Sequence, residues 1–497
     1  MGADKAWGSA LALALALALG AGRAEAQGGG IPGRPAQEDL VNFGALGAAG
    51  AEDGAALRVQ RVLDGPGQAA GLAPGDVITG AGGRAFQAAG GEAPGPRLQL
   101  VAALEQAEGA RRPRPLELQV TRGGESRTIA VRLGKLGAHS KACPTQCKKC
   151  KAVARAGLEF LARTQAGDGS FPTDLGGQTG LVVVTSLGGL AFLAQGVKPT
   201  ANSPLGRAIE YVRTRCNTPD PMAGRMGGVG GGRGNWNQVN WELAYGLIFL
   251  AEAARATRRA DLEAKCAELV QALQRTQEAS GGWAHGPGGP NALGYLELEI
   301  LSNYALLGLG AAQKLGIEFD GDKVARALGW IEQTAGPDGG VGYSPRQGQK
   351  GFGDPGRTAG ALVAYAAVGQ ARHPFFGKMV GYFGQHAARL PEGHVSPAQH
   401  LLAGAMASRL LGNKAWGSYW QAFRPLVMSL RRPDGSFASM PTAESRRMGS
   451  NSDLTCGPRW TTATYVLVLS LTGSDALPLL LDGEVEKGRS RPRTGGR

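Results

Sequence analysis

The chain has 497 residues, enough for two or three domains with hydrophobic cores of their own. Apolar residues make up 43% of the sequence and 81 residues are glycine, which suits a globular protein with many turns and excludes a low-complexity one. The formal net charge of +13 is spread along the chain, so it indicates a mild attraction to acidic surfaces and no dedicated nucleic-acid partner.

The N-terminus, residues 1–26, carries the three parts of a secretory signal peptide. Lys5 supplies a positive charge, residues 10–20 form an alternating alanine and leucine run, and Ala24-Glu25-Ala26 supplies a cleavage site. The apolar run is too short to cross a bilayer as a mature helix, so no transmembrane anchor is expected. We predict cleavage before Gln27, export to the periplasm or the extracellular space, and a Gly/Pro-rich linker over residues 27–38.

Residues 39–136 have the polarity pattern of strands together with one helix. Three stretches alternate as half-buried strands do, namely residues 57–62, 115–121 and 126–133, and residues 98–108 are expected to form the helix. After the first strand, residues 70–78 read A-G-L-A-P-G-D-V-I. This run resembles the A-G-L-x-x-G-D-x-I signature of bacterial-type PDZ domains, which implies a small α/β domain.

The PDZ resemblance also implies a binding function. In that family an extended peptide, often the C-terminus of a protein, adds a strand beside the helix, and a glycine-rich loop binds its carboxylate. The candidate for this loop is Phe43-Gly44-Ala45-Leu46-Gly47, which departs from the usual family pattern. Because some PDZ-like modules only brace a neighbouring domain, that structural role is the alternative.

Residues 137–150 form a linker that contains half of the six cysteines. Cys143, Cys147 and Cys150 have the spacing C-x3-C-x2-C, whereas the other three are scattered at positions 216, 266 and 456. In an exported chain, disulfides are the leading interpretation, followed by free thiols and then by a metal site. A zinc site needs a fourth ligand, which the cluster lacks locally, and no histidine follows Cys150 to attach haem. No metal or other cofactor is therefore predicted.

A short turn pattern recurs six times within residues 151–477. Each copy is a glycine, a small residue and an apolar residue, and His394 replaces the small residue in the fifth copy. The apolar positions are 58, 54, 58, 54 and 42 residues apart, at Phe171, Val229, Trp283, Val341, Val395 and Phe437. Each turn lies between an amphipathic stretch and a nearly all-apolar stretch, so each repeat is a helical hairpin with an outer and an inner helix.

Six hairpins predict twelve helices. Outer helices are expected at residues 153–164, 205–215, 262–276, 324–334, 374–389 and 419–430. Inner helices are expected at residues 181–195, 241–256, 298–315, 358–368, 399–411 and 461–471. Alternating outer and inner helices close naturally into an (α/α)6 toroid. The predicted fold is therefore multidomain: a small α/β PDZ domain, an all-α toroid and a basic tail at 478–497.

Two of the turns, Gln165–Phe171 and Gln277–Trp283, resemble the Q-x-x-D-G-x-W turns of the terpenoid cyclase and protein prenyltransferase toroids. The whole layout also resembles a family of secreted bacterial proteins of unknown function that combine a PDZ domain with a toroid. The D-x-D-D acid of squalene-type cyclases is missing, since the D-x-D at Asp320 lacks the following aspartate. Cyclase activity is therefore not expected, and no HExxH, GxSxG or P-loop motif is present.

The geometry of a toroid indicates where a site would lie. Parallel inner helices bring their N-termini together at one end, where unpaired N–H groups favour anions. The candidate catalytic residues at this end are His394, His400, Glu297, Asp354 and Arg357, and Glu299 lies two residues from Glu297. The candidate ligand-binding residues are Asn235, Trp236, Asn237, Asn240, Trp241 and Arg459, and helix capping or solvation is the alternative for them. For the catalytic set, the alternative is that His394 is a solvated turn residue and that Arg357 and Asp354 form a structural ion pair.

Two functions remain compatible with these patterns. The first is an exported binding protein, whose PDZ domain binds a peptide or protein C-terminus and whose toroid presents a cavity for an anionic or glycan ligand. The second is a toroid enzyme, a hydrolase or lyase of a glycan or lipid-like substrate that uses the histidines and carboxylates. The missing catalytic signatures favour binding, whereas two carboxylates about 5–10 Å apart across the cavity would favour hydrolysis.

Overall fold

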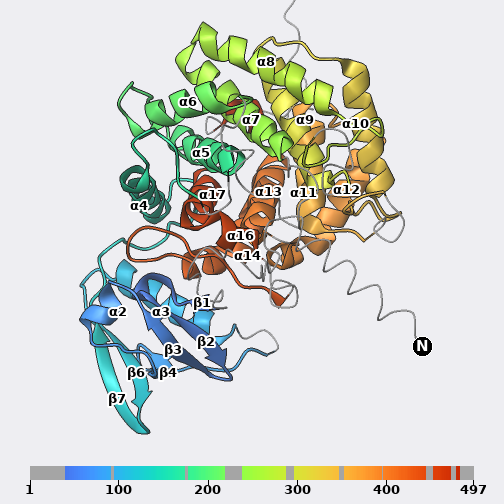
Figure 1. Cartoon of the computed structure of the whole chain (residues 1–497). Helices are drawn as coiled ribbons and strands as arrows, with labels where there is room; N and C mark the ends of the chain where they lie inside the picture. The colour runs from blue at the N-terminus through green and yellow to red at the C-terminus, as the bar shows by residue number, and fades with distance from the viewer. Residues whose placement is uncertain are drawn as a thin grey trace, which may run out of the picture.

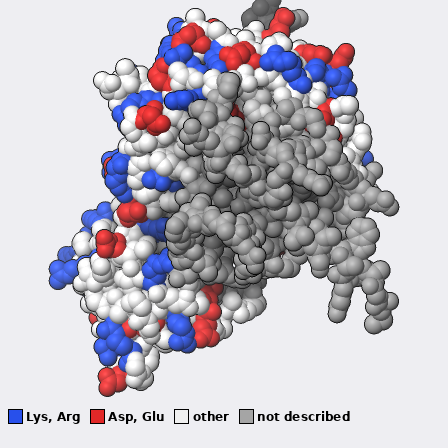
Figure 2. Space-filling view, in the orientation of Figure 1, with Lys and Arg blue, Asp and Glu red and all other residues white. Residues whose placement is uncertain are grey.

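The computed structural model describes residues 40–90, 94–173, 177–218, 238–286, 296–345, 352–394, 396–443, 451–471 and 477–481. These residues form a small sheet domain and a larger helical domain that pack against each other (Figure 1). The predicted signal peptide, the 27–38 linker, the turn at Val229 and most of the basic tail lie outside the described residues. On the face seen in Figure 2, the described basic and acidic side chains are interspersed over both domains.

The sheet domain is antiparallel, with strand order β1-β2-β3-β4-β6-β7 and a short β5 beside β4. Its strands are β1 (Val41–Asn42), β2 (Ala48–Asp53), β3 (Ala56–Val62), β4 (Val77–Ala81), β5 (Arg84–Ala85), β6 (Leu116–Arg122) and β7 (Glu125–Val131). In β3, Leu57 and Val59 are buried and Arg58 is exposed, as the alternating pattern predicts. The short helix α2 (Pro66–Ala69) follows β3, and α3 (Pro96–Gly109) packs Leu100 and Leu104 into the core of the domain. The expected strands and helix are therefore confirmed.

The helical domain contains six outer and six inner helices among the described residues. The outer helices are α4 (Lys148–Thr164), α6 (Pro204–Arg215), α8 (Ala260–Thr276), α10 (Gly321–Thr334), α12 (Pro374–His386) and α14 (Asn413–Ser429). The inner helices are α5 (Gly177–Ala194), α7 (Val239–Thr257), α9 (Glu299–Lys314), α11 (Pro355–Ala367), α13 (Pro397–Leu410) and α17 (Pro458–Ser470). Each inner helix contacts the next and α17 contacts α5, so the inner helices form a closed ring.

The predicted boundaries of these helices are confirmed to within a few residues, except at some N-termini. Five inner helices begin two to four residues earlier than expected, three of them at a proline (Pro355, Pro397 and Pro458), and the outer helices α4 and α14 begin five and six residues early. Proline at the first helical position has no N–H that would need an acceptor, and its φ is that of a helix. It therefore begins each of these three helices two or three residues before the start that the apolar periodicity predicts. Short elements complete the chain: η1 (Gly44–Leu46), η2 (Ala387–Glu392), α16 (Ser452–Cys456) and α18 (Pro478–Leu481).

Four of the repeated turns share one geometry. Their first glycines, Gly169, Gly281, Gly339 and Gly435, have φ between +86° and +104°, the left-handed region that suits glycine. The apolar residue two positions later donates its backbone N–H to a hydroxyl of the following inner helix, as Phe171 does to Thr185 Oγ1 at 2.9 Å and Val341 does to Thr358 Oγ1 at 2.9 Å. These bonds fix each turn against its own hairpin.

The fifth turn departs from this pattern. Gly393 has φ −53° and follows the 3-10 helix η2, so it does not adopt the left-handed conformation of the other turns. A side chain at Gly393 or at Gly356 would instead collide with the ring of His400, which packs against both glycines. Glycine at this position therefore provides space for a buried histidine.

One described helix, α5, is long and apolar enough to cross a membrane by length and composition. It lies within the ring of inner helices, and 72% of its apolar window is buried there. Its composition is therefore explained by its place in the protein core.

The two domains meet through a buried network of charges. Lys149 at the start of α4 is fully buried and donates to Glu108 Oε2 on α3 at 2.8 Å. Arg431, after α14, reaches the same carboxylate with two hydrogen bonds of 3.0 and 3.2 Å. Glu108 thus joins the sheet domain to the first and the last outer helix of the helical domain.

Candidate functional site

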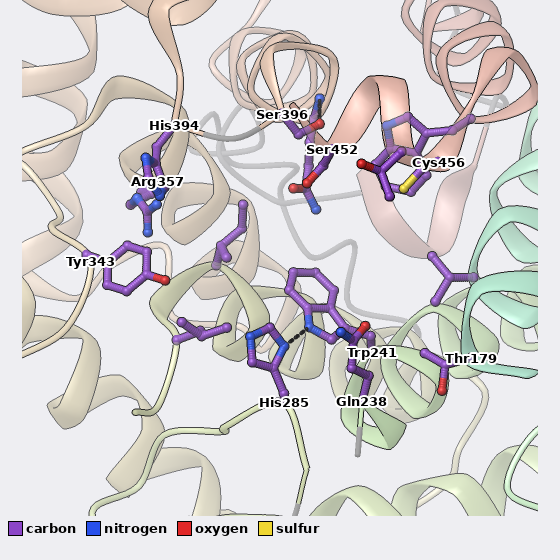
Figure 3. A pocket seen from close by; sticks show the side chains of 16 residues that line it. Thr179, Gln238, Trp241, His285, Tyr343, Arg357, His394, Ser396, Ser452 and Cys456 are labelled. Carbon is purple, nitrogen blue, oxygen red and sulfur yellow. Dashed lines mark hydrogen bonds between the residues drawn. The ribbon is translucent and has the colours of Figure 1, made fainter. Parts of the chain in front are cut away.

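A cavity of about 820 Å³, part of it open to solvent, lies at the N-terminal ends of the inner helices (Figure 3). All six inner helices or the residues just before them contribute to its wall: Thr179, Trp241, Leu298, Arg357, Ser396 and Trp460. The expectation that the inner helices begin at one end of the ring is therefore confirmed.

The wall of the cavity is largely apolar and aromatic. Val183, Leu298 and Ile300 line it together with the indole rings of Trp241 and Trp460. The ring of Trp241 stacks near Tyr245, with 6.4 Å between their centroids, and Tyr245 in turn lies 6.0 Å from Trp460. This packing holds the two indoles in place, so they offer a preformed apolar surface.

Arg357 is the cation that lines this cavity among the described residues. Its side chain is 3% exposed, and its guanidinium carbon lies 4.4 Å from the centroid of the Tyr343 ring. The Nη1 atom is buried and has no hydrogen-bond partner among the described residues. Burying part of a guanidinium without a partner is costly, so the site is suited to a ligand that accepts this hydrogen bond.

Two carboxyl groups interact electrostatically with Arg357: Asp354, which precedes α11, and Glu299, in the first turn of α9. Glu299 is fully buried and accepts a hydrogen bond from Asn303 Nδ2 at 2.6 Å. Burial raises the pKa of Glu299 to about 8, although Arg357 and Asn303 oppose this shift. Near neutral pH Glu299 is thus largely protonated, so this group does not neutralise the charge of Arg357.

The raised pKa of Glu299 predicts a specific pH dependence of stability. The folded protein keeps a proton that the unfolded chain releases near pH 4.3, so this group should destabilise the fold progressively as the pH rises from there to about 8. Glu299→Gln should remove this contribution to the pH dependence of the free energy of unfolding. The difference in stability between the variant and the wild type should therefore shift in favour of the variant as the pH rises through this interval. Urea unfolding of both proteins from pH 5 to pH 9 measures it, with Glu297→Gln as the control. Parallel curves for wild type and Glu299→Gln would contradict the assignment. The groups that face Glu299 are Arg357, Asp354 and Tyr365.

Several lining residues, among them His285, Tyr343 and Trp460, are absent from the candidates that the sequence suggested; His285 and Tyr343 share one signal. Trp241 Nε1 donates to His285 Nδ1 at 2.8 Å, and burial lowers the pKa of His285 to about 3, so the ring is neutral. Both residues lie two positions after the apolar residue of a repeated turn, Trp283 and Val341. That shared offset in the repeat is the signal that could have identified them.

The structure places two of the predicted catalytic residues at the cavity wall and the others outside it. His394 and Arg357 line the cavity, and the His394 ring meets Tyr343 edge-on at 5.6 Å. His400 is fully buried outside the lining, with Nδ1 3.2 Å from Asp354 Oδ1. Burial would raise the pKa of Asp354, but His400 and Arg357 outweigh it and lower that pKa. Asp354 also caps α11 by accepting from the backbone of Gly356, so this pair has a structural role.

The remaining predicted residues are mostly placed elsewhere. Glu297 accepts a hydrogen bond from Ser280 Oγ at 3.0 Å and does not line the cavity. Asn240 is buried and donates to the Ala284 carbonyl at 2.8 Å, and Arg459 donates to the carbonyls of Thr164 and Pro172. Trp241 lines the cavity, whereas Asn235, Trp236 and Asn237 lie outside the described residues.

Acidic residues do not line the described part of the cavity wall. Asp453, which follows the lining residue Ser452, accepts hydrogen bonds from Ser396 Oγ, the Ala398 N–H and Trp460 Nε1. The pair of facing carboxylates that would favour hydrolysis is therefore missing from the described lining.

The predicted carboxylate-binding loop, Phe43 to Gly47, lies in the interface between the domains. Its residues form η1, which contacts α14, and a side chain added at Gly47 would come within 2.8 Å of the Pro433 ring. The outer edge of β2 is paired with β1 of the same chain, Val41 opposite Gly50 and Asn42 opposite Ala49. Asn42 Nδ2 also donates to the Ser429 and Arg431 carbonyls. This geometry favours the bracing role over peptide binding at this edge.

The fold and the cavity define a two-domain protein with a closed ring of helical hairpins and a largely apolar cavity at one end of the ring. The family described as DUF6288, a domain of unknown function, matches residues 150–473, so the chain belongs to that family. The matched segment coincides with the helical ring.

Solved structures with a similar fold have low sequence identity to this chain. An inactive variant of the α-1,6-mannanase GH76A of Salegentibacter sp. HEL1_6, in complex with α-1,6-mannotriose, is 11% identical, with a TM-score of 0.45 over 65% of this chain and 98% of its own. The type II terpene cyclase MstE from Scytonema, in its apo form, is 19% identical, with a TM-score of 0.39 over 67% of this chain and 98% of its own. These likenesses concern the fold only, and no curated protein matches the sequence.

Proposed function

We propose that the helical ring binds a small organic anion, with its acidic group at Arg357 and its apolar part against Trp241 and Trp460. The observation that carries this proposal is the buried guanidinium, whose Nη1 lacks a hydrogen-bond partner among the described residues at the wall of an apolar cavity. The N-terminus of α11, which carries Arg357, adds positive potential at the same place.

Binding is preferred to catalysis because the described lining supplies a cation, aromatic rings and neutral polar groups, but no carboxylate. A hydrolase of the kind considered above needs two carboxyl groups as acid and base or nucleophile. The sheet domain has the role of a brace in this proposal, and export of the chain remains a prediction from its N-terminal sequence.

A matched pair of fluorescent probes tests the proposal. 8-Anilinonaphthalene-1-sulfonate has aromatic rings and an anionic group, and N-phenyl-1-naphthylamine has the same rings without the charge. The wild type should bind the sulfonate about 10–100-fold more tightly, since a charge-assisted hydrogen bond contributes about 1.5–3 kcal/mol. Arg357→Gln should remove this preference, whereas Trp241→Ala should weaken binding of both probes. Fluorescence titration measures the affinities.

Arg389→Gln, which alters an exposed arginine in η2, is the matched control and should leave both affinities unchanged. Thermal unfolding of each variant checks that the fold is retained. Equal affinity of the wild type for both probes, or a folded Arg357→Gln protein that keeps its preference for the sulfonate, would contradict the proposed anion site.

A further inference from the structure

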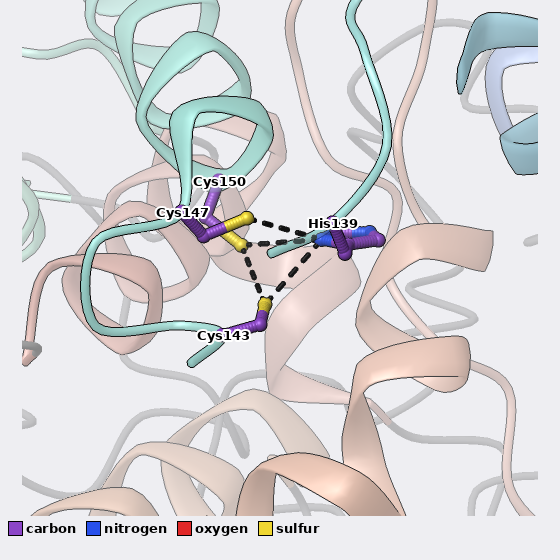
Figure 4. A group of neighbouring side chains, drawn as sticks. All are labelled: His139, Cys143, Cys147 and Cys150. Atoms are coloured by element: carbon purple, nitrogen blue, oxygen red, sulfur yellow. Dashed lines mark hydrogen bonds between the residues drawn. The ribbon is translucent and has the colours of Figure 1, made fainter. Parts of the chain in front are cut away.

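Four side chains with metal-binding atoms converge beside the boundary between the two domains (Figure 4). They are His139, Cys143, Cys147 and Cys150, and their ligand atoms all lie within 4.8 Å of one another. His139, four residues before Cys143, is therefore the fourth ligand that the cysteine spacing alone did not supply. The full spacing is H-x3-C-x3-C-x2-C.

The distances within this cluster match the edges of a tetrahedron around one metal ion. His139 Nδ1 lies 3.4 Å from Cys143 Sγ, 3.4 Å from Cys147 Sγ and 3.6 Å from Cys150 Sγ, and the Cys143 and Cys150 sulfurs are 3.4 Å apart. Zinc with bonds of about 2.3 Å to sulfur and about 2.0 Å to nitrogen requires edges of roughly 3.5–3.8 Å. The nitrogen is thus nearly equidistant from three sulfurs, as a common central ion would place it.

Side chains around the cluster orient its ligand atoms, as they do in known metal sites. The other ring nitrogen of His139, Nε2, lies 2.5 Å from Glu105 Oε1 on α3, so Nδ1 faces the sulfurs. Trp420 Nε1 on α14 donates to Cys143 Sγ at 2.9 Å. A carboxylate behind a ligating histidine fixes its tautomer and raises its basicity, and an N–H donor stabilises a thiolate.

We propose that His139, Cys143, Cys147 and Cys150 bind one zinc ion, which holds the linker between the sheet domain and the helical ring. The first two ligands come from the linker and the last two from the start of α4, while the supporting groups Glu105 and Trp420 come from α3 and α14. Zinc binding converts the three thiols to thiolates and releases their protons to solvent. The three-sulfur, one-nitrogen ligand set is typical of structural zinc sites.

A disulfide is the competing state of these cysteines. All six cysteines are among the described residues and none of them forms a disulfide, so the pairing that the sequence favoured is not present in the structure. A disulfide within the cluster would join two of the three sulfurs. The third thiol and His139 Nδ1 would then have no common partner to bind. The zinc site uses all four groups.

The test measures the metal directly in the full chain. Protein produced in zinc-supplemented medium and purified without chelator should contain one zinc per chain by elemental mass spectrometry. Cys147→Ser and His139→Gln should lower this content strongly, and Cys266→Ser, which alters a buried cysteine of α8 outside the cluster, should not. Glu105→Gln should weaken zinc binding about 10–100-fold through its effect on His139.

A second measurement does not depend on the folding of variants. Zinc-free wild type, prepared with a chelator and a reductant, should take up one cobalt(II) and develop the thiolate-to-cobalt absorption of a tetrahedral sulfur site. Trypsin should cleave after the exposed Lys141 faster in the zinc-free protein than in the loaded protein. Wild type that carries no metal and takes up no cobalt, or that contains a disulfide within the cluster, would overturn the proposal, as would metal content unchanged in the folded Cys147→Ser variant.

Discussion

Replacing Gly339 by alanine should lower the free energy of unfolding by about 2–4 kcal/mol. Gly339 has φ +86°, and a methyl group added there would come within 2.6 Å of the backbone carbonyl of Lys378 in α12. The left-handed backbone conformation and the collision destabilise the variant separately. The turn cannot relax easily, because the Val341 N–H is hydrogen-bonded to Thr358 Oγ1. Urea unfolding followed by circular dichroism measures the loss.

Gly316 separates the two contributions. It has nearly the same backbone angle, φ +85°, but an added methyl group would meet no atom within 4 Å. Gly316→Ala should therefore cost about 1 kcal/mol, the conformational part alone. Equal losses at Gly339 and Gly316 would show that the close contact between turn and outer helix contributes nothing.

Replacing Glu108 by alanine should destabilise the protein by about 3–5 kcal/mol, because it leaves the buried Lys149 without its closest partner. Burial alone would raise the pKa of Glu108, but Arg431 and Lys149 outweigh it and lower that pKa below its ordinary value. The stabilisation is therefore complete above the unfolded-state pKa, about 4.3, and is lost as the pH falls through the folded-state pKa. Thermal unfolding at pH 7 and at pH 3 should show a smaller difference between variant and wild type at the lower pH.

Glu117, an exposed residue of β6 in the same domain, provides the matched control. Glu117→Ala should change the stability by less than about 0.5 kcal/mol. Because Glu108 joins the domains, its variant should also become more sensitive to trypsin in the linker after β7. A Glu108→Ala protein with wild-type stability and wild-type proteolysis would refute the bracing role of this contact.

Most of the fold could be predicted from the sequence because the signals are local. The turn glycines must have positive φ, which is a property of single residues, and the apolar periodicity identifies each helix without knowledge of its neighbours. Some departures have local causes as well. Prolines begin three of the inner helices early, and in the fifth turn Gly393 makes room for the ring of the buried His400.

The site was predicted less completely because side-chain direction depends on packing. Arg357 and His400 are both near the start of an inner helix, yet Arg357 lines the cavity and His400 is buried against Gly356 and Gly393. Spacing along one helix could not distinguish them, since the neighbouring hairpins decide which face is covered. The same holds for the loop at Phe43: its sequence suits a peptide terminus, and only the structure shows that the end of α14 and Pro433 lie beside it.

The contact between each turn and an outer helix has a consequence for how the chain assembles. Gly169, Gly281 and Gly339 each lie against the outer helix that follows in sequence, but Gly435 of the last hairpin lies against Ala156 of the first. The same junction includes the hydrogen bond from Arg459 to the Thr164 carbonyl across 295 residues. A chain that has formed only some hairpins therefore leaves the facing surfaces of α5 and α17 uncovered until this ring-closing contact forms. The last hairpin thus closes the ring against the first, and a chain that lacked either of them would lack this contact.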